Sequence, residues 1–500
     1  MKKGSLIRIL LAASLVLSAL LPACAEKTPA EETGATTAVP QAVTEEPAET
    51  ADPSTLPDQG LFSLDFGGEK IRIATTEPRE YEFKAEEQTG SVVNDAVLTR
   101  NQTVMSDLGI AAFETVPYPE SGGNSKELKN AVIAANKAGG DDAIDFITAP
   151  SYYTTSYITD GLILNLEAIE GSRIDTGKTY WSGKYYENGM FNGKAFFLIG
   201  DLTPTLIEKL EVVFLNDTLA ETYLAGEPKT LYQTVYDGEW TFDRFLELVA
   251  KCGDAASSKI YGCDLPNNSY TIDGFEAGMC IDLVRKLDDT IESGVTGEQN
   301  VEIIETLRKF YYENPAVNCQ QNQNYPYFKS GTALFGAGLL QYSKDFIAAD
   351  IDYSIYPMPM RNADQADYVA ISQDTHSIIC IPKCAADRAE MITAVLEDLA
   401  YRSHDTVYMA MYELTYSARY SDNAAESEMF DFINRHVAFS FGSIYSYILG
   451  EVKNTPRYLV YPSTASSSVT VSSPIASSLK TLDKLLTAKF KTFLTALEDY

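Results

Sequence analysis

Apolar and polar residues follow two spacings along most of the chain after residue 60. Short, nearly continuous apolar runs, as in buried strands, lie at residues 70–75, 143–148, 212–215, 332–335, 353–356 and 377–381. Longer stretches with apolar residues every three or four positions, as on one helix face, lie at 92–108, 128–138 and 301–312. The repeated strand–helix–strand order predicts α/β architecture, with mostly parallel sheets and helices on both faces.

The ends of some helices are also marked. Thr241 is a good N-cap for a helix over 242–252, and Gly253 follows its last turn. Trp240, directly before this helix, is expected to pack in the core. Helices dominate from residue 385 to the end of the chain, and no internal repeat is present.

Residues 1–23 have the pattern of a secretory signal peptide, with a basic start and an apolar run over 9–21. That run is too short to span a bilayer as a helix, which takes about 20 residues. It ends at Leu21-Pro22-Ala23-Cys24, which resembles a lipobox, although Pro22 is unusual there. We therefore expect Cys24 to carry the lipid that holds the protein at the outer face of the cell membrane. The alternative is a plain secretory signal followed by an ordinary thiol.

Composition and charge narrow the classes of protein further. Residues 24–60 are rich in Pro, Thr, Glu and Ala, which predicts a disordered linker. The remaining stretch of about 440 residues is long for one core and favours two lobes. A formal net charge of −31 argues against nucleic acid as a partner. For the six cysteines after Cys24, buried apolar packing is favoured over disulfides, with Cys252–Cys263 the nearest plausible pair.

Ligands of open α/β sheets bind outside the carboxyl ends of strands. This rule selects polar and aromatic residues that follow the predicted strands, together with two glycines that would let backbone approach a ligand. They are Glu77, Arg79, Tyr152, Tyr153, Gly336, Gly338 and Gln341. Tyrosine faces and planar polar groups suit a sugar, which presents ring faces and hydroxyls. Packing of the tyrosines and a tight turn at the glycines are the alternatives.

Three more residues are candidates for ligand contact. Trp181 lies in an aromatic stretch and either stacks on a sugar or packs in the core. Asp201 follows Gly200 and either accepts sugar hydroxyls or forms a hinge turn. Asp273 is a candidate for the second lobe, with a solvated loop as the alternative.

Nothing in the sequence has the pattern of a catalytic, metal or cofactor site. The histidines are His376, His404 and His436, without H-E-x-x-H spacing, and there is neither a G-x-S-x-G elbow nor a phosphate loop. Close carboxylate pairs are expected among 70 Asp and Glu, so they say nothing about a glycosidase. We expect a protein that is not an enzyme, with no metal and no cofactor.

Several segments, in order, resemble extracellular solute-binding protein family 1, the maltose-type substrate-binding proteins of ABC transporters, and in particular its clostridial members. They are SVVNDAVLTRN at 91–101, AIDFITAPSYYTTSYITDGLILNL at 143–166, EWTFDRFLEL at 239–248, YFKSGTALFGAGLL at 327–340 and YSIYPMPM at 353–360. The family's Trp after the later strand is absent, because Gly338 is followed by two leucines.

The resemblance implies a two-lobed periplasmic-binding-protein-like fold of type II, with the ligand in the cleft between discontinuous lobes. Lobe 1 would comprise 61–198 and 332–385, and lobe 2 would comprise 199–331 and 386–500. The implied function is a monomeric, extracellular lipoprotein of an ABC importer that delivers a carbohydrate to the permease subunits. The alternatives are a surface glycoside hydrolase and a ligand-sensing or adhesion lipoprotein on the same scaffold.

Overall fold

The computed structural model describes residues 55–58, 60–139, 144–227, 230–266, 270–319, 324–416, 424–461, 469 and 471–500. The described residues belong to one compact unit, Ala51–Tyr500. The expected signal peptide, the lipidation site Cys24 and nearly all of the expected linker lie outside the described residues. Among the described helices, none combines the length and the apolar character that a membrane crossing requires.

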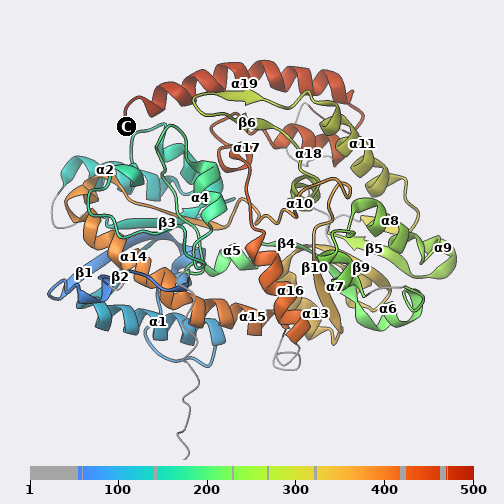
Figure 1. The fold of residues 1–500 in the computed structure, drawn as a ribbon, viewed down its shortest axis with the longest axis horizontal. Coiled ribbons are helices and arrows are strands. Elements are labelled where there is room, and N and C mark those ends of the chain that lie inside the picture. Colours follow the sequence, from blue (N-terminus) through green and yellow to red (C-terminus); the bar gives the residue numbers. More distant parts are fainter. Residues whose placement is uncertain are drawn as a thin grey trace, which may run out of the picture. The chain divides into compact units, whose positions relative to one another are not determined.

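The first of two large sheets has the strand order β11-β3-β1-β2. Figure 1 labels three of these strands, β1, β2 and β3. Its strands are β1 (Glu69–Thr76), β2 (Ile110–Tyr118), β3 (Phe146–Pro150) and β11 (Ser377–Cys380). β1 runs parallel to β2 and β3, whereas β11 is antiparallel to β3. Helices associated with this part are α1 (Val92–Leu108), α2 (Lys126–Ala138), α3 (Ser151–Thr154), α4 (Gly183–Gly189) and α14 (Ala389–Ser403).

The second large sheet has the order β10-β4-β9-β5-β8 and is mixed, with two parallel and two antiparallel pairs. Its strands are β4 (Glu211–Asn216), β5 (Tyr261–Leu265), β8 (Val317–Cys319), β9 (Ala333–Leu339) and β10 (Tyr353–Pro357). The helices of this part are α5 (Pro204–Glu208), α6 (Asp217–Tyr223), α7 (Leu231–Tyr236), α8 (Phe242–Ala250), α9 (Ala255–Ser258), α10 (Tyr270–Gly278), α11 (Glu298–Tyr312), α12 (Pro326–Lys329) and α13 (Ser343–Ala348). A small hairpin joins β6 (Val284–Lys286) to β7 (Ile291–Ser293).

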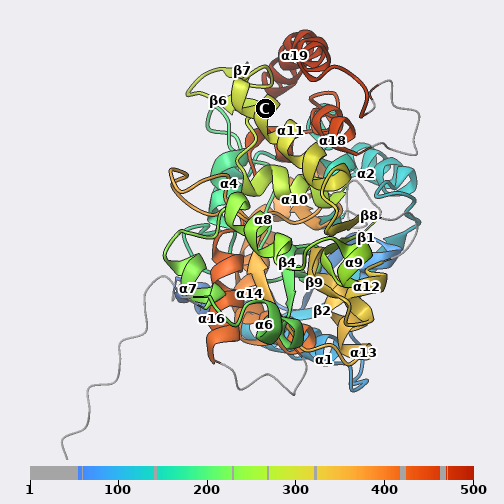
Figure 2. The same cartoon turned by 90° about the vertical axis from the view of Figure 1, so that its right-hand side faces the viewer.

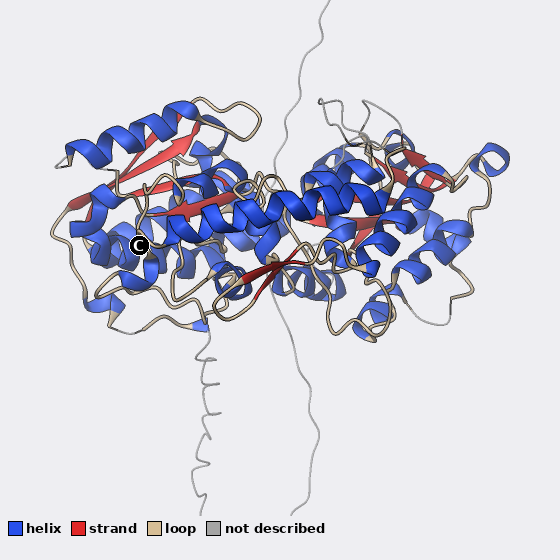
Figure 3. Ribbon diagram, turned by 90° about the horizontal axis from the view of Figure 1, so that it is seen from above, coloured by secondary structure: helices blue, strands red, loops and turns tan. Residues whose placement is uncertain are grey.

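The carboxyl-terminal part of the chain is helical and lies against elements around both sheets. It contains a π-helical turn (His404–Tyr408), α15 (Met409–Tyr416), α16 (Ala424–Arg435), α17 (Phe441–Ile444), α18 (Asn454–Val460) and α19 (Ile475–Leu497). α19 packs on α11, α18 and β7 (Figure 2), and it runs across the molecule seen from above (Figure 3). At its far end Lys194 Nζ donates a hydrogen bond of 2.6 Å to the carbonyl of Leu497. Tyr500 packs edge-on against Phe196, with 4.7 Å between ring centroids.

The strand pairing corrects the expected lobe boundaries. β9 and β10 pair with β4 and β5, so 332–357 join the second sheet rather than the first. β9 is buried at every position, which requires neighbours on both edges and cover on both faces, and the second sheet provides them. α14 packs against α1, and its apolar side chains share a core cluster with Ile71 and Phe146, so 389–403 lie with the first sheet.

The start of α8 and the state of the cysteines can be compared directly with the sequence predictions. Thr241 Oγ1 accepts a hydrogen bond of 3.2 Å from the Arg244 amide, which confirms its prediction as the N-cap of α8. Trp240 is fully buried, and its Nε1 donates to the carbonyl of Pro357 at 2.8 Å. The six cysteines after Cys24 are free thiols in the structure.

Candidate functional site

The carboxyl ends of β1, β2 and β3 meet at one edge of the first sheet, because the three strands are parallel neighbours. The segments that follow these strands are polar or aromatic. They bring Arg79, Glu120 and Tyr152 to that edge, which is where ligands of α/β sheets bind.

Arg79 is the best-connected of these residues. It is buried, and its Nη1 forms an ion pair with Glu120 and a 3.3 Å hydrogen bond to Thr76 Oγ1. Its Nη2 donates to the carbonyl of Thr375, in the segment between β10 and β11. Its Nε is buried and receives no partner from the described residues. Glu77, two residues earlier, is exposed and does not join this group.

Three tyrosines gather beside Arg79's end of the sheet. The ring centroids of Tyr152 and Tyr153 are 4.9 Å apart. The ring centroid of Tyr447 lies 5.3 Å from that of Tyr152 and 4.7 Å from that of Tyr153. Tyr447 follows α17, nearly three hundred residues later in the chain. Burial raises the pKa of Tyr152, so its hydroxyl stays neutral and can both donate and accept hydrogen bonds. The cluster offers apolar ring surface next to polar groups.

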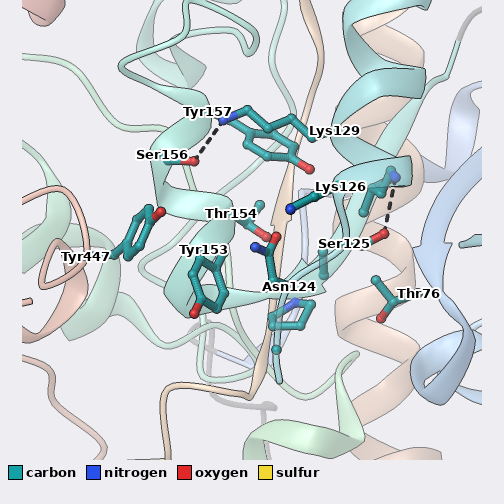
Figure 4. A pocket seen from close by; sticks show the side chains of 14 residues that line it. Thr76, Asn124, Ser125, Lys126, Lys129, Tyr153, Thr154, Ser156, Tyr157 and Tyr447 are labelled. Atoms are coloured by element: carbon teal, nitrogen blue, oxygen red, sulfur yellow. Dashed lines mark hydrogen bonds between the residues drawn. The ribbon is translucent and has the colours of Figure 1, made fainter. Parts of the chain in front are cut away.

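A pocket of about 190 Å³ opens against this cluster. Figure 4 shows Tyr153 and Tyr447 on one side of it and the polar side chains of Thr76, Asn124 and Ser125 on the other. Ser125 is held as the N-cap of α2, because its Oγ accepts a hydrogen bond of 3.1 Å from the Leu128 amide. An aromatic wall facing polar groups is the arrangement expected for a small polar solute.

A buried group of four charges lies next to the tyrosines. Lys453 Nζ donates to Asp273 Oδ2 and to Asp374 Oδ2, both at 3.0 Å. Arg457 donates to both oxygens of Asp273, with Nε at 2.7 Å from Oδ1, and its Nη2 lies 3.5 Å from Asp374 Oδ2. We call these four residues the charge cluster. Two carboxylates balance two cations, which is how buried charges are tolerated.

Residues 373–376 connect the groups described so far. The backbone carbonyl of Asp374 accepts hydrogen bonds from the Tyr152 amide at 3.0 Å and from Ser151 Oγ at 2.8 Å. Its side chain belongs to the charge cluster, and the next carbonyl, of Thr375, binds Arg79. The structure thus links the predicted residues Arg79, Tyr152 and Asp273 through one short segment that passes between the two sheets.

Comparison with solved structures identifies the architecture. Neither family models nor curated protein sequences give a match. A cyclo/maltodextrin-binding protein complexed with maltotetraose is similar, with a TM-score of 0.55 at 16% identity over 85% of this chain and 98% of that one. UgpB from Mycobacterium tuberculosis, in complex with glycerophosphocholine, also gives 0.55, at 11% identity over 86% and 100%. The galacto-N-biose-/lacto-N-biose I-binding protein from Bifidobacterium longum gives 0.52, at 13% identity over 86% and 98%.

The chain has a two-lobed periplasmic-binding-protein-like fold. This confirms the predicted two-lobed α/β class, whereas the prediction of mostly parallel sheets is wrong for the second sheet, in which two of the four strand pairs are antiparallel. Gln341 follows β9 of the second sheet, and its Oε1 accepts a hydrogen bond of 2.9 Å from Lys209 Nζ.

The two candidate glycines lie elsewhere than expected in this periplasmic-binding-protein-like fold. Gly336 and Gly338 are inside β9, not in a turn after it. Gly338 has a φ of +148°, and a Cβ there would lie 2.0 Å from the hydroxyl oxygen of Tyr325. The missing side chain is therefore explained by close packing of Tyr325, whose hydroxyl donates to the carbonyl of Ala337 at 3.0 Å.

Trp181 and Asp201 form a second group. Trp181 is buried, and its Nε1 donates to Glu397 at 2.8 Å. Asp201 is buried too, with Oδ2 lying 2.7 Å from His404 Nδ1. Both residues line a pocket of about 540 Å³ beside α15 and α16, which shares no lining residue with the pocket at Tyr153.

Sequence reasoning missed Asp374, Thr375, Tyr447, Lys453 and Arg457. None of them directly follows a predicted strand, so the strand-end rule does not reach them. Lys453 and Arg457 are spaced by four residues, which places them on one helix face, but nothing in the local pattern shows which carboxylates they meet.

Proposed function

We propose that this protein is the substrate-binding lipoprotein of an ABC importer and that it captures a carbohydrate at the tyrosine cluster. The observation that carries the proposal is the meeting of Tyr152, Tyr153 and Tyr447 beside a polar pocket at the carboxyl ends of parallel strands. The similar solved structures hold maltotetraose, lacto-N-biose or glycerophosphocholine, which are polar solutes rich in hydrogen-bonding groups.

The chemistry of the site suits a sugar. Tyrosine rings stack against the C–H faces of a pyranose, and they cost little conformational entropy because they are already packed against one another. Hydroxyls need partners that both donate and accept. Asn124, Ser125 and Thr76 in the pocket, and Arg79 with Glu120 near it, supply them.

The test is isothermal titration calorimetry over a panel of mono-, di- and oligosaccharides, with glycerophosphodiesters as a second panel. We expect one class of sugar to bind, and Tyr153→Ala to weaken its binding about tenfold, because about 1.4 kcal/mol of stacking is lost. Tyr236→Ala, at an exposed tyrosine on α7, is the matched control and should bind normally. Equal loss in both variants, or binding only of non-sugar solutes, would contradict the proposal, and so would turnover of the bound sugar.

The anchoring at Cys24 is tested separately in cells. We expect metabolic labelling with palmitate to mark the wild-type protein, and Cys24→Ser to abolish the label and release the protein from the membrane fraction. Cys384→Ser is the matched control, and it should leave both labelling and membrane retention unchanged. A Cys24→Ser protein that stays lipid-labelled would refute the anchor while leaving the solute-binding proposal intact.

A further inference from the structure

A third pocket is separate from the tyrosine site and from the pocket at Trp181. It has a volume of about 270 Å³ and lies between α10, the segment after it and the chain around α17. Its apolar walls are formed by Ile281, Leu283, Val369, Ile371 and Phe439. It shares no lining residue with the pocket at Tyr153, so whatever occupies it does not compete directly for that site.

One wall of this pocket carries a buried carboxyl group. Glu276, on α10, is 2% exposed and lines the pocket. No described residue donates a hydrogen bond to its Oε1. A buried oxygen without a donor costs on the order of 1–3 kcal/mol, and such groups are uncommon in folded proteins.

The neighbouring cations cannot serve as the partner of Glu276. Lys453 also lines the pocket, but its ammonium is directed at Asp273 and Asp374, and Arg457 is likewise bound to these aspartates. The charge cluster is balanced without Glu276. Burial raises the pKa of Glu276, with the carboxylate of Asp273 adding to the effect and the two cations opposing it. A raised pKa favours the neutral, protonated form of this carboxyl group when no cation lies beside it.

We propose that this pocket binds a small organic ammonium ion with an apolar body, and that Glu276 is its counter-ion. The apolar body lies against the aliphatic walls, and the ammonium donates a hydrogen bond to Glu276. Binding moves one proton: the carboxyl group of Glu276 releases it to solvent, and the carboxylate that remains pairs with the ammonium. The ligand thus supplies the cation that this buried acid lacks.

Cys280 provides a direct measure of occupancy. It lines the same pocket, its thiol is free, and it is partly exposed. Its left-handed backbone, with φ +57°, holds it at the turn after α10. A ligand in the pocket should shield this thiol from alkylation. Cys384, which is also free and partly exposed, lies outside this pocket and serves as the internal reference.

The experiment measures alkylation of Cys280 and Cys384 by mass spectrometry in the presence of isopentylamine or isopentanol. We expect the amine to slow alkylation of Cys280 at least tenfold, the alcohol to have little effect, and Cys384 to react equally in all samples. Calorimetry in buffers of different ionisation enthalpy should show release of about one proton per amine bound. Equal protection by the alcohol, or amine binding without proton release, overturns the proposal.

Two variants separate loss of the site from loss of the fold. Glu276→Gln should abolish protection by the amine and proton release, and Ala277→Leu, which fills the pocket, should abolish protection with Glu276 in place. Glu292→Gln, at an exposed position in β7, is the matched control and should behave as wild type. Amine protection that survives in a folded Glu276→Gln protein, judged by an unchanged thermal unfolding midpoint, refutes the role of Glu276. Because the readouts need no sugar, this result is independent of the proposed solute function.

Discussion

Replacing Lys453 by Met removes one of two cations from the buried charge cluster. Lys453 donates hydrogen bonds of 3.0 Å to both aspartates of the cluster. After the substitution Asp273 keeps two contacts with Arg457, whereas Asp374 keeps only one long contact, of 3.5 Å. Removing one partner of a buried ion pair typically costs about 3–5 kcal/mol. We therefore expect Lys453→Met to lower the free energy of unfolding by an amount in that range.

A double-mutant cycle adds a second substitution that restores the balance of charge. Lys453→Met combined with Asp374→Asn leaves one carboxylate, Asp273, facing one guanidinium, that of Arg457. We expect the double variant to recover at least half of the loss. The coupling energy between the two substitutions should then be at least about 1.5 kcal/mol, which is well above the additivity error of distant sites.

Guanidinium unfolding followed by tryptophan fluorescence measures these quantities. The chain has two tryptophans, and each is buried in a different apolar core cluster: Trp181 in a cluster with residues of the first sheet, and Trp240 in a larger cluster that contains residues of both sheets. Trp181→Phe and Trp240→Phe backgrounds therefore report the two clusters one at a time. A loss below about 1 kcal/mol for Lys453→Met, or strict additivity in the double variant, would refute the reasoning about the uncompensated charge.

Two further predictions concern other buried positions. Burial raises the pKa of Glu397 to about 7 from an ordinary value of 4.5, so between these pH values the folded state holds a proton that the unfolded state has lost. The free energy of unfolding of the wild type should therefore fall as pH rises through this window, by about 3 kcal/mol at most. Glu397→Gln should lack this loss when urea unfolding midpoints are compared at pH 4 and pH 8. Parallel pH profiles of the two proteins would contradict this prediction. Gly338→Ala should lower unfolding free energy by at least about 2 kcal/mol, because the new Cβ meets the Tyr325 hydroxyl and the backbone is strained. Thermal unfolding checks this, and adding Tyr325→Phe should recover part of the loss; an unchanged midpoint for Gly338→Ala would be evidence against the close contact.

The sequence predicts elements with strong periodicity well. The helix expected over 92–108 has these bounds in the structure, and the strand expected at 353–356 is one residue longer. β2 was missed, because only one of its nine residues is buried and its sequence, IAAFETVPY, has no clear alternation. It is placed as a strand by its pairing with β1, which is a tertiary contact.

The strand-end rule predicts the site in part, for a physical reason. It finds Arg79 and the Tyr152–Tyr153 pair, because each follows a strand of the same parallel group and such ends must meet at one edge. It does not find Tyr447, which reaches the cluster from the helical end of the chain. It also selects Gly338, which lies inside β9 and has no side chain because Tyr325 packs too close to allow a Cβ.

Residues 373–376 link the tyrosine cluster and Arg79 to the charge cluster. Within this segment, one carbonyl holds the amide of Tyr152, the next holds Arg79, and the side chain of Asp374 holds Lys453. We therefore expect a solute that shifts Tyr152 or Arg79 to shift the segment as well, which would change the distance from Asp374 to its cations. Since the charges are buried, small changes of distance cost more there than at the surface. If this edge binds a solute as proposed, we expect contacts at Tyr152 and Arg79 to be coupled to α10 and α18 through the charge cluster.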